Sequence, residues 1–169
     1  MLQAVTLEEL RQDPKLTPQK FAKHFDSFRY VYHDEVQTPE AFLLTEAGDC
    51  DDYATLADLV LREKGYTTRL VAVRMPGITH VVCYVVEVKA YLDFNNRVYL
   101  KRLVSSDGSL KDIARKVAKS FEASWTSASE FTYSEGLKRL VQTISKTDDY
   151  TETKARAKPS PSSQTNRAR

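Results

Sequence analysis

Three residues that together could support nucleophilic catalysis follow one another along the chain: Cys50, His80 and Asp93. Cys50 stands in the run GDCDDYA (residues 48–54), directly before a helical pattern. The unpaired N–H groups of a first helical turn favour a thiolate. An imidazole can accept the thiol proton, and a carboxylate can orient the imidazole. The three residues therefore predict a Cys-His-Asp triad.

The third position of this triad has two candidates, Asp93 and Asn95. A hairpin that sets His80 opposite Asp93 would turn at Val86 and Glu87, where no turn residue stands. A turn within the more polar residues 87–90 would displace Asp93 by some four residues, roughly 13 Å along the strand. A β-bulge could repair the pairing. Asn95 shares a strand face with Asp93 and is the alternative partner of the imidazole.

Asp49, Asp51 and Asp52 surround the cysteine, and negative charge nearby opposes ionisation of a thiol. We favour a capping role, in which Asp49 and Asp51 meet backbone N–H groups and the helix dipole. Cys83 alternates onto the strand face opposite His80, so we expect it to be inert. A zinc site made of Cys50, His80 and Cys83 is excluded for the same reason.

Several elements must position these residues. The helix that begins at Cys50 carries its apolar side chains at three- and four-residue steps and ends at Gly65, and Cys50 heads this buried stripe. Thr-Pro pairs at residues 17–18 and 38–39 predict two earlier helices, the second ending near Gly48.

The pattern after Gly65 predicts mainly strands. Residues 67–74 and 80–86 are strands around a Pro76-Gly77 turn, and the second is apolar on both faces, which is typical of a central strand. Residues 91–95 and 98–104 are shorter strands divided by an Asn-Asn turn. Helices are predicted over residues 110–121, capped by Ser109, and over residues 135–144.

Length and charge limit the organisation of the chain. Its 169 residues fit one domain, which we place at residues 1–148, followed by a disordered basic tail at residues 149–169. The formal charge is +2; five bases and one acid from residue 151 onward give the tail +4 and leave the body −2. We expect no specific nucleic-acid binding by the body and weak contact of the tail with acidic surfaces.

The composition also bears on location and cofactors. No apolar run approaches the ~20 residues that cross a bilayer, and the first nine residues lack the basic start and apolar stretch of a signal peptide. We therefore predict a cytoplasmic protein with reduced cysteines and no membrane contact. The five glycines are scattered, so no phosphate-binding motif is present and no cofactor is expected.

The run GDCDDYA resembles the transglutaminase-like cysteine superfamily, as do Thr38-Pro39-Glu40 before it and the later segments THVV (residues 79–82) and YLD (residues 91–93). The resemblance implies an α+β, papain-like fold in which the nucleophile helix packs on an antiparallel β-sheet. It makes Cys50 the nucleophile, His80 the base and later the acid, and Asp93 the residue that holds the imidazole.

The resemblance also suggests two additions to the site. The family usually supplies an oxyanion donor from upstream, and here residues 28–32 offer Tyr30 or Tyr32, although packing over the cleft explains these aromatics equally well. In bacterial transglutaminase-like periplasmic proteases the acids beside the nucleophile resemble a calcium site, which would use the three aspartates here. Without a secretory signal we predict no metal.

The superfamily includes proteases, amidases, peptide N-glycanases and cross-linking acyltransferases. We expect thiol-dependent acyl transfer on a peptide or protein substrate, with hydrolysis of a peptide or amide bond as the outcome. Only residues 28–32 and Trp125 could wall the thiol from water, and an open cleft favours hydrolysis. The alternatives are a protein-glutamine transglutaminase, a catalytically silent transglutaminase-like module that binds proteins, or an interaction protein that uses its basic tail.

Overall fold

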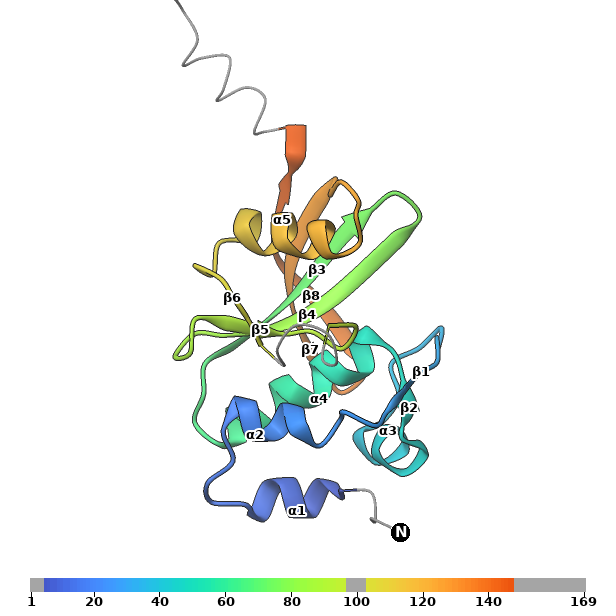
Figure 1. The fold of residues 1–169 in the computed structure, drawn as a ribbon, viewed down its shortest axis with the longest axis vertical. Helices are drawn as coiled ribbons and strands as arrows, with labels where there is room; N and C mark the ends of the chain where they lie inside the picture. Colours follow the sequence, from blue (N-terminus) through green and yellow to red (C-terminus); the bar gives the residue numbers. More distant parts are fainter. Residues whose placement is uncertain (1–4, 97–102, 148–169) are drawn as a thin grey trace, which may run out of the picture.

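A six-stranded antiparallel sheet with the order β6-β5-β4-β3-β7-β8 forms the body of the protein (Figure 1). The computed structural model describes residues 5–96 and 103–147. The strands are β3 (Thr68–Met75), β4 (Ile78–Val85), β5 (Ala90–Leu92), β6 (Leu103–Ser105), β7 (Ser127–Ser134) and β8 (Leu137–Ser145). The predicted tail at residues 149–169 lies outside the described residues.

Helices cover the sheet and complete an α+β architecture, as predicted. They are α1 (Leu7–Gln12), α2 (Pro18–Lys23), α3 (Pro39–Thr45), α4 (Cys50–Glu63) and α5 (Leu110–Ser120). Short strands β1 (Arg29–Tyr30) and β2 (Ala47–Gly48) form a separate parallel pair. No helix within residues 5–96 and 103–147 is long and apolar enough to cross a membrane.

The two faces of the sheet have separate hydrophobic cores because side chains alternate along each strand. On one face α4 packs against β3 and β4 and buries Leu70, Val81 and Cys83. On the other face α5 packs over Val73 and Val82. Strand β4 lies between β3 and β5 and is buried on both faces, which confirms the predicted central strand.

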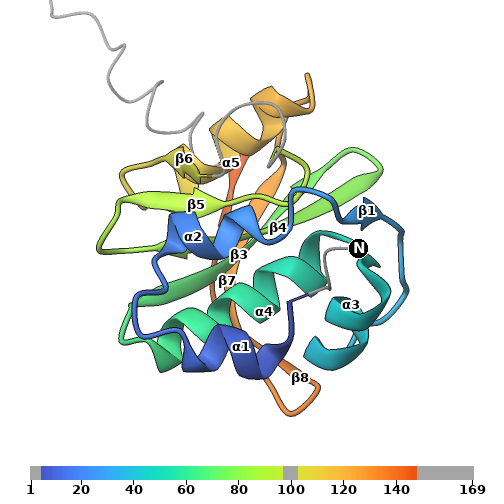
Figure 2. The same ribbon diagram turned by 60° about the horizontal axis from the view of Figure 1, so that its bottom comes forward.

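An aromatic cluster fixes the outer side of α4. Phe21 and Phe25 of the α2 region contact the Tyr53 ring at centroid distances of 5.7 and 5.1 Å, and Phe25 stacks on Phe42 of α3 at 5.9 Å. Figure 2 shows α1 and α2 lying along α4 on the side away from β7. Helix α4 is therefore packed between the sheet and the N-terminal helices.

The Thr-Pro pairs cap α2 and α3 as expected. Thr17 and Thr38 each accept a hydrogen bond from the backbone N–H three residues later, at 3.2 Å. Helix α3 ends at Thr45, earlier than predicted, because Glu46 adopts a left-handed conformation with φ 47°. That turn frees residues 47 and 48 to pair with β1 instead of continuing the helix.

The prediction of a helix over residues 135–144 is wrong. Strands β7 and β8 form a hairpin there, and Glu135 and Gly136 have φ values of 52° and 75°, which suit a tight hairpin turn. The apolar residues that gave the helical pattern, Leu137, Leu140 and Val141, are 57%, 66% and 56% exposed, so they do not mark a buried helix face. The preceding strand β7 is rich in serine and was not predicted.

The short strands differ from prediction in their ends. β5 stops at Leu92 because Asp93 begins a turn, so residues 93–95 are not a strand. β6 covers Leu103–Ser105, whereas residues 98–102 of the strand predicted at 98–104 lie outside the described residues. Helix α5 and its Ser109 cap agree with prediction.

Gly48 should tolerate a side chain poorly. A Cβ at this position would lie 2.5 Å from an Asp52 carboxylate oxygen and 2.6 Å from the Phe42 ring. We expect Gly48→Ala to lower the free energy of unfolding by about 1–3 kcal/mol, as overpacking does, in urea titrations followed by circular dichroism.

Gly65→Ala is the matched control. Gly65 has φ 87° and no atom within 4 Å of an added Cβ, so only backbone strain of about 1 kcal/mol is expected. Equal losses in the two variants would contradict a steric role for Gly48.

Candidate functional site

Cys50 is the first residue of α4 and lies where that helix meets the sheet. Its side chain is buried against the core, with 9% of the residue exposed. The parallel pairing of β1 with β2 sets Tyr30 beside Gly48, two residues before the thiol. Cys50 thus stands at a helix N-terminus with an aromatic strand alongside.

His80 and Asp93 are joined by a buried hydrogen bond. The distance between His80 Nε2 and Asp93 Oδ1 is 2.9 Å, and the two residues are 2% and 1% exposed. The ring of Phe121 lies over His80 at a centroid distance of 4.9 Å. Since Nε2 faces the carboxylate, Nδ1 is the ring nitrogen left for Cys50, whose thiol is among the groups that raise the pKa of His80.

The register of β4 and β5 explains how the pair forms. Val85 pairs with Ala90 and Cys83 with Leu92, so the same register sets Asp93 opposite Val82, two residues from His80. The expected four-residue displacement is therefore wrong, because the turn falls at residues 86–89, with φ 48° at Lys89, and needs no turn residue of the usual type. His80, Val82 and Asp93 lie on the same face of the sheet. The side chains of His80 and Asp93 span the two-residue offset between them.

Asp93, and not Asn95, provides the side chain that meets the His80 ring. The backbone N–H groups of Asn95 and Asn96 donate to Asp93 Oδ1 at 3.0 and 3.4 Å, and Asn96 Nδ2 donates to Oδ2 at 2.7 Å. Sequence reasoning missed Asn96. The Asp-x-Asn-Asn order after a strand was an available signal, since an aspartate often accepts the N–H two residues on.

The electrostatics of His80 are set by its two neighbours. Burial by itself lowers the pKa of His80, but the charge and hydrogen bond of Asp93, with those of Cys50, raise it to about 10. Burial raises the pKa of Asp93, whereas His80, Asn96 and the backbone of Asn95 together hold it below its usual value. An imidazolium is thus favoured between a carboxylate and the thiol at neutral pH.

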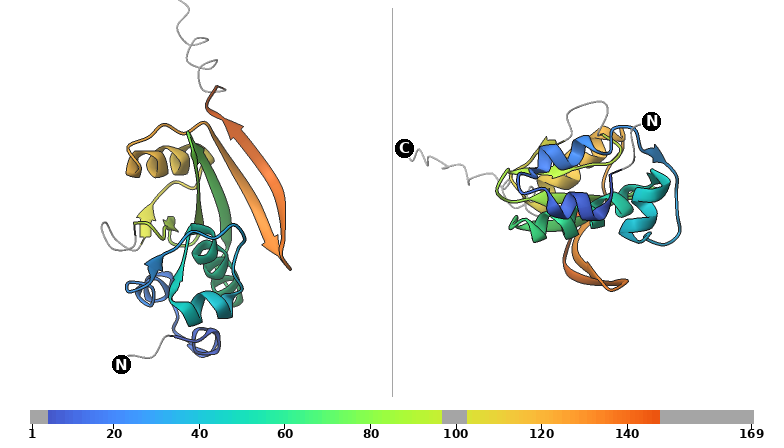
Figure 3. Two further views of the ribbon diagram at one scale, coloured as in Figure 1. Left: turned by 90° about the vertical axis from the view of Figure 1, so that its right-hand side faces the viewer. Right: turned by 90° about the horizontal axis from the view of Figure 1, so that it is seen from below.

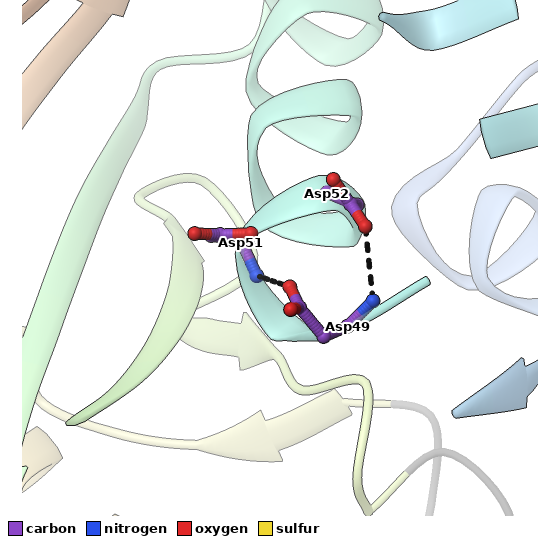
Figure 4. Close-up of side chains that lie close together, drawn as sticks. All are labelled: Asp49, Asp51 and Asp52. Atoms are coloured by element: carbon purple, nitrogen blue, oxygen red, sulfur yellow. Dashed lines mark hydrogen bonds between the residues drawn. The ribbon is translucent and has the colours of Figure 1, made fainter. Parts of the chain in front are cut away.

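Two of the three aspartates at the helix start bind backbone N–H groups (Figure 4). Asp49 accepts from the N–H groups of Asp51 at 3.3 Å and His33 at 3.0 Å. Asp52 accepts from the N–H of Asp49 at 3.0 Å and from the backbone and side chain of Gln37 at 2.6 and 2.8 Å. These bonds confirm the predicted capping role of Asp49, and they show that Asp52, rather than the predicted Asp51, is the second capping residue.

The third aspartate, Asp51, behaves differently. Burial, followed by the neighbouring Asp49 and Asp52 carboxylates, raises the pKa of Asp51 to about 8, so it is largely neutral at pH 7. One oxygen from each aspartate lies within 4.8 Å of the others. All four carboxylate oxygens of Asp49 and Asp52 already accept hydrogen bonds, an arrangement that suits helix capping better than cation binding.

Cys83 lies on the opposite face of β4 from His80, in the core under α4. The residue is fully buried, and burial raises the pKa of its thiol well above the usual value. Such a thiol is a poor nucleophile. The prediction that Cys83 points away from His80 is therefore confirmed.

The aromatic strand upstream places Tyr30 near the thiol. Burial, followed by electrostatic interaction with Cys50 and Asp49, raises the pKa of Tyr30, and its ring lies 6.4 Å from that of Phe94. Tyr32 is 70% exposed and has no such contact with Phe94 among the ring pairs of the described residues. Trp125 is buried in the core under α5.

Comparison with known proteins identifies the family of this chain. A model of the transglutaminase-like superfamily matches residues 8–96, from α1 through the turn after Asp93, and so covers more than half of the chain. A comparison with curated proteins gives no match. The chain therefore belongs to the transglutaminase-like superfamily.

Proposed function

We propose that the protein is a cysteine peptidase or amidase in which Cys50, His80 and Asp93 act as nucleophile, acid and base, and orienting carboxylate. The observation that carries this proposal is the buried 2.9 Å contact between His80 and Asp93, with Cys50 at a helix N-terminus and near enough to raise the pKa of His80. Each feature favours a thiolate paired with an imidazolium.

The reaction would proceed in two stages. The Cys50 thiolate attacks the carbonyl carbon of a peptide or amide, and the imidazolium of His80 gives its proton to the departing amine, which leaves a thioester. A water molecule then attacks the thioester and passes a proton to His80. Cleavage of the carbon–sulfur bond releases the acid and restores the thiolate–imidazolium pair.

Two donors could stabilise the oxyanion in this reaction. The first is the backbone N–H of Cys50 at the start of α4. The second is the hydroxyl of Tyr30, which stays protonated at neutral pH because the pKa of Tyr30 is raised. The position of Tyr30 beside Gly48 supports this assignment over Tyr32.

Hydrolysis is favoured over amine transfer by what surrounds the thiol. Amine transfer needs walls that exclude water while an amine enters. Trp125, one of the two sources of aromatic walls considered from the sequence, packs under α5 instead. Tyr30 is 54% exposed, which supports an open approach to Cys50.

Cys50→Ala should abolish amide cleavage, while Cys83→Ala should keep it because Cys83 lies on the face of β4 opposite His80. Cleavage is measured by mass spectrometry on a peptide library that contains glutamine, in the presence of a labelled primary amine. Cys50-dependent incorporation of the amine in excess of cleavage or deamidation would replace the hydrolase by a transferase. Activity that survives Cys50→Ala would refute the role of the thiol.

Asp93→Asn should keep the fold but reduce kcat by about 10²- to 10⁴-fold, because the imidazole loses its orienting charge. Asn96→Ala should cause a smaller loss, since it removes one of the bonds to Asp93. Asn95→Ala is the matched control, because Asn95 supports Asp93 through its backbone N–H. A larger loss with Asn95→Ala than with Asp93→Asn would transfer the orienting role to Asn95.

The activity should fall as pH rises through about 10, because the departing amine needs a proton from His80, whose pKa is raised to about 10. A raised pKa means that the protonated form persists above the ordinary value and is lost at high pH. In Asp93→Asn this alkaline limb should move to lower pH, since the charge of Asp93 favours the imidazolium. Profiles of kcat/KM from pH 7 to 11 measure the alkaline limb of the unmodified protein and that of Asp93→Asn. If the two alkaline limbs fall at the same pH, Asp93 does not raise the pKa of His80.

A further inference from the structure

A large groove runs between helix α4 and the β7–β8 hairpin, with a volume of about 1080 Å³. One wall is the outer face of α4, with Thr55 and Leu59, and the other is the hairpin, with Phe131 and Tyr133. Figure 3 shows the free end of this hairpin standing out from the body of the protein. The groove is therefore built by the hairpin that the sequence did not predict.

The groove begins beside the proposed catalytic residues. Asp51 and Val81 line it, and they are the chain neighbours of Cys50 and His80. Consecutive Cα atoms are about 3.8 Å apart, so at Asp51 the groove lies one residue from Cys50 along α4, whereas the Val81 side chain shares the strand face of Cys83, opposite His80. From Asp51 to Arg62 the helix rises about 16 Å, the length of roughly five extended residues. The groove can hold a short extended peptide that leads to Cys50.

The charge of the lining favours a cationic occupant. Five acidic and two basic residues line the groove. Asp58 and Arg62 pair with each other at 2.9 Å, and Glu63 pairs with Arg11 outside the groove. The acids that remain are Glu35, Glu135 and, when it is ionised above its raised pKa of about 8, Asp51; the remaining base is Lys138. A Lys or Arg side chain complements this set better than an acidic one.

Asp51 carries an acceptor with no partner. Its Oδ1 atom is buried and has no hydrogen bond to any described residue. Figure 4 shows the Asp51 carboxylate pointing away from Asp52. An unsatisfied buried acceptor is costly, and an N–H donor of a ligand would remove that cost. The unpaired oxygen thus stands at the end of the groove nearest Cys50.

We propose that this groove binds an extended polypeptide substrate and that Asp51 receives a Lys or Arg side chain next to the amide that Cys50 attacks. The identity of the attacked bond rests on the proposed function, whereas binding in the groove does not need the reaction. The apolar part of the lining, with Leu59 and Phe131, would pack against neighbouring side chains of the peptide.

The test measures peptide binding in Cys50→Ala, which cannot react. Fluorescence anisotropy compares labelled octapeptides that carry one Lys or Arg with matched peptides that carry norleucine, at pH 9, where Asp51 is ionised. We expect the basic peptides to bind about tenfold more tightly or better. Asp51→Asn in the same background should remove this preference, and Thr55→Trp, which fills the groove, should weaken all peptides.

Glu8→Gln is the matched control, because Glu8 lies on α1, outside the groove lining. Circular dichroism of each variant reports folding, which matters for Thr55→Trp because it removes the hydroxyl that donates to the carbonyls of Asp51 and Asp52. Equal binding of basic and norleucine peptides, or binding unchanged by both Asp51→Asn and Thr55→Trp, would overturn the proposal. If peptides bind in the groove but the unmodified protein does not cleave them, only the proposed function is refuted. If cleavage is unchanged by Asp51→Asn and Thr55→Trp, only the groove proposal is refuted.

Discussion

The N-terminus of α4 is buried, so its backbone N–H groups need hydrogen-bond partners inside the protein. Asp49 and Asp52 supply them, and both side chains are nearly fully buried. The same two carboxylates also bind the backbone at His33 and Gln37. One capping network therefore joins α4 to the loop between β1 and α3, and holds Cys50 in place between them.

This network has an electrostatic consequence for the thiol. Three carboxylates beside a cysteine would oppose a thiolate if all were ionised. Asp49 and Asp52 are matched to N–H groups at the positive end of the helix, and Asp51 is largely neutral at pH 7 because burial raises its pKa to about 8. The protonated His80 on the other side supplies a positive charge. The thiol thus stands among acids whose charge is largely compensated.

The His80 imidazole must also be held in one orientation by a hydrogen-bond partner. Asp93 does this from the end of β5, and it is itself held by two backbone N–H groups and Asn96. Burial of such a pair is unfavourable unless its hydrogen bonds are complete. Because the turn after β5 supplies these hydrogen bonds, it is part of the candidate site. The His80–Asp93 pair therefore also depends on the register of β4 and β5.

Much of this could be derived from residue order. The Thr-Pro starts, the amphipathic stripe after Cys50 and the two strands around Gly77 depend on local sequence, and all were predicted in type and approximate position. The family followed from the GDCDDYA run together with the later THVV and YLD segments. Helix capping by Asp49 was also readable, since a cap acts within one helical turn.

Other features depended on contacts between distant residues. Leu137, Leu140 and Val141 have helical spacing, but pairing of β8 with β7 overrides it, and only the tertiary structure reveals that these side chains are exposed. Asp93 reaches His80 because the register of β4 and β5 offsets the two residues by only two positions. A turn with φ 48° at Lys89 sets this register, and no glycine, asparagine or proline marks that turn in the sequence. The sequence by itself determined which residues could do chemistry and the helix that carries the thiol. The tertiary structure decided that Asp93, rather than Asn95, meets the imidazole, because register and turn geometry are properties of paired strands rather than of either strand alone.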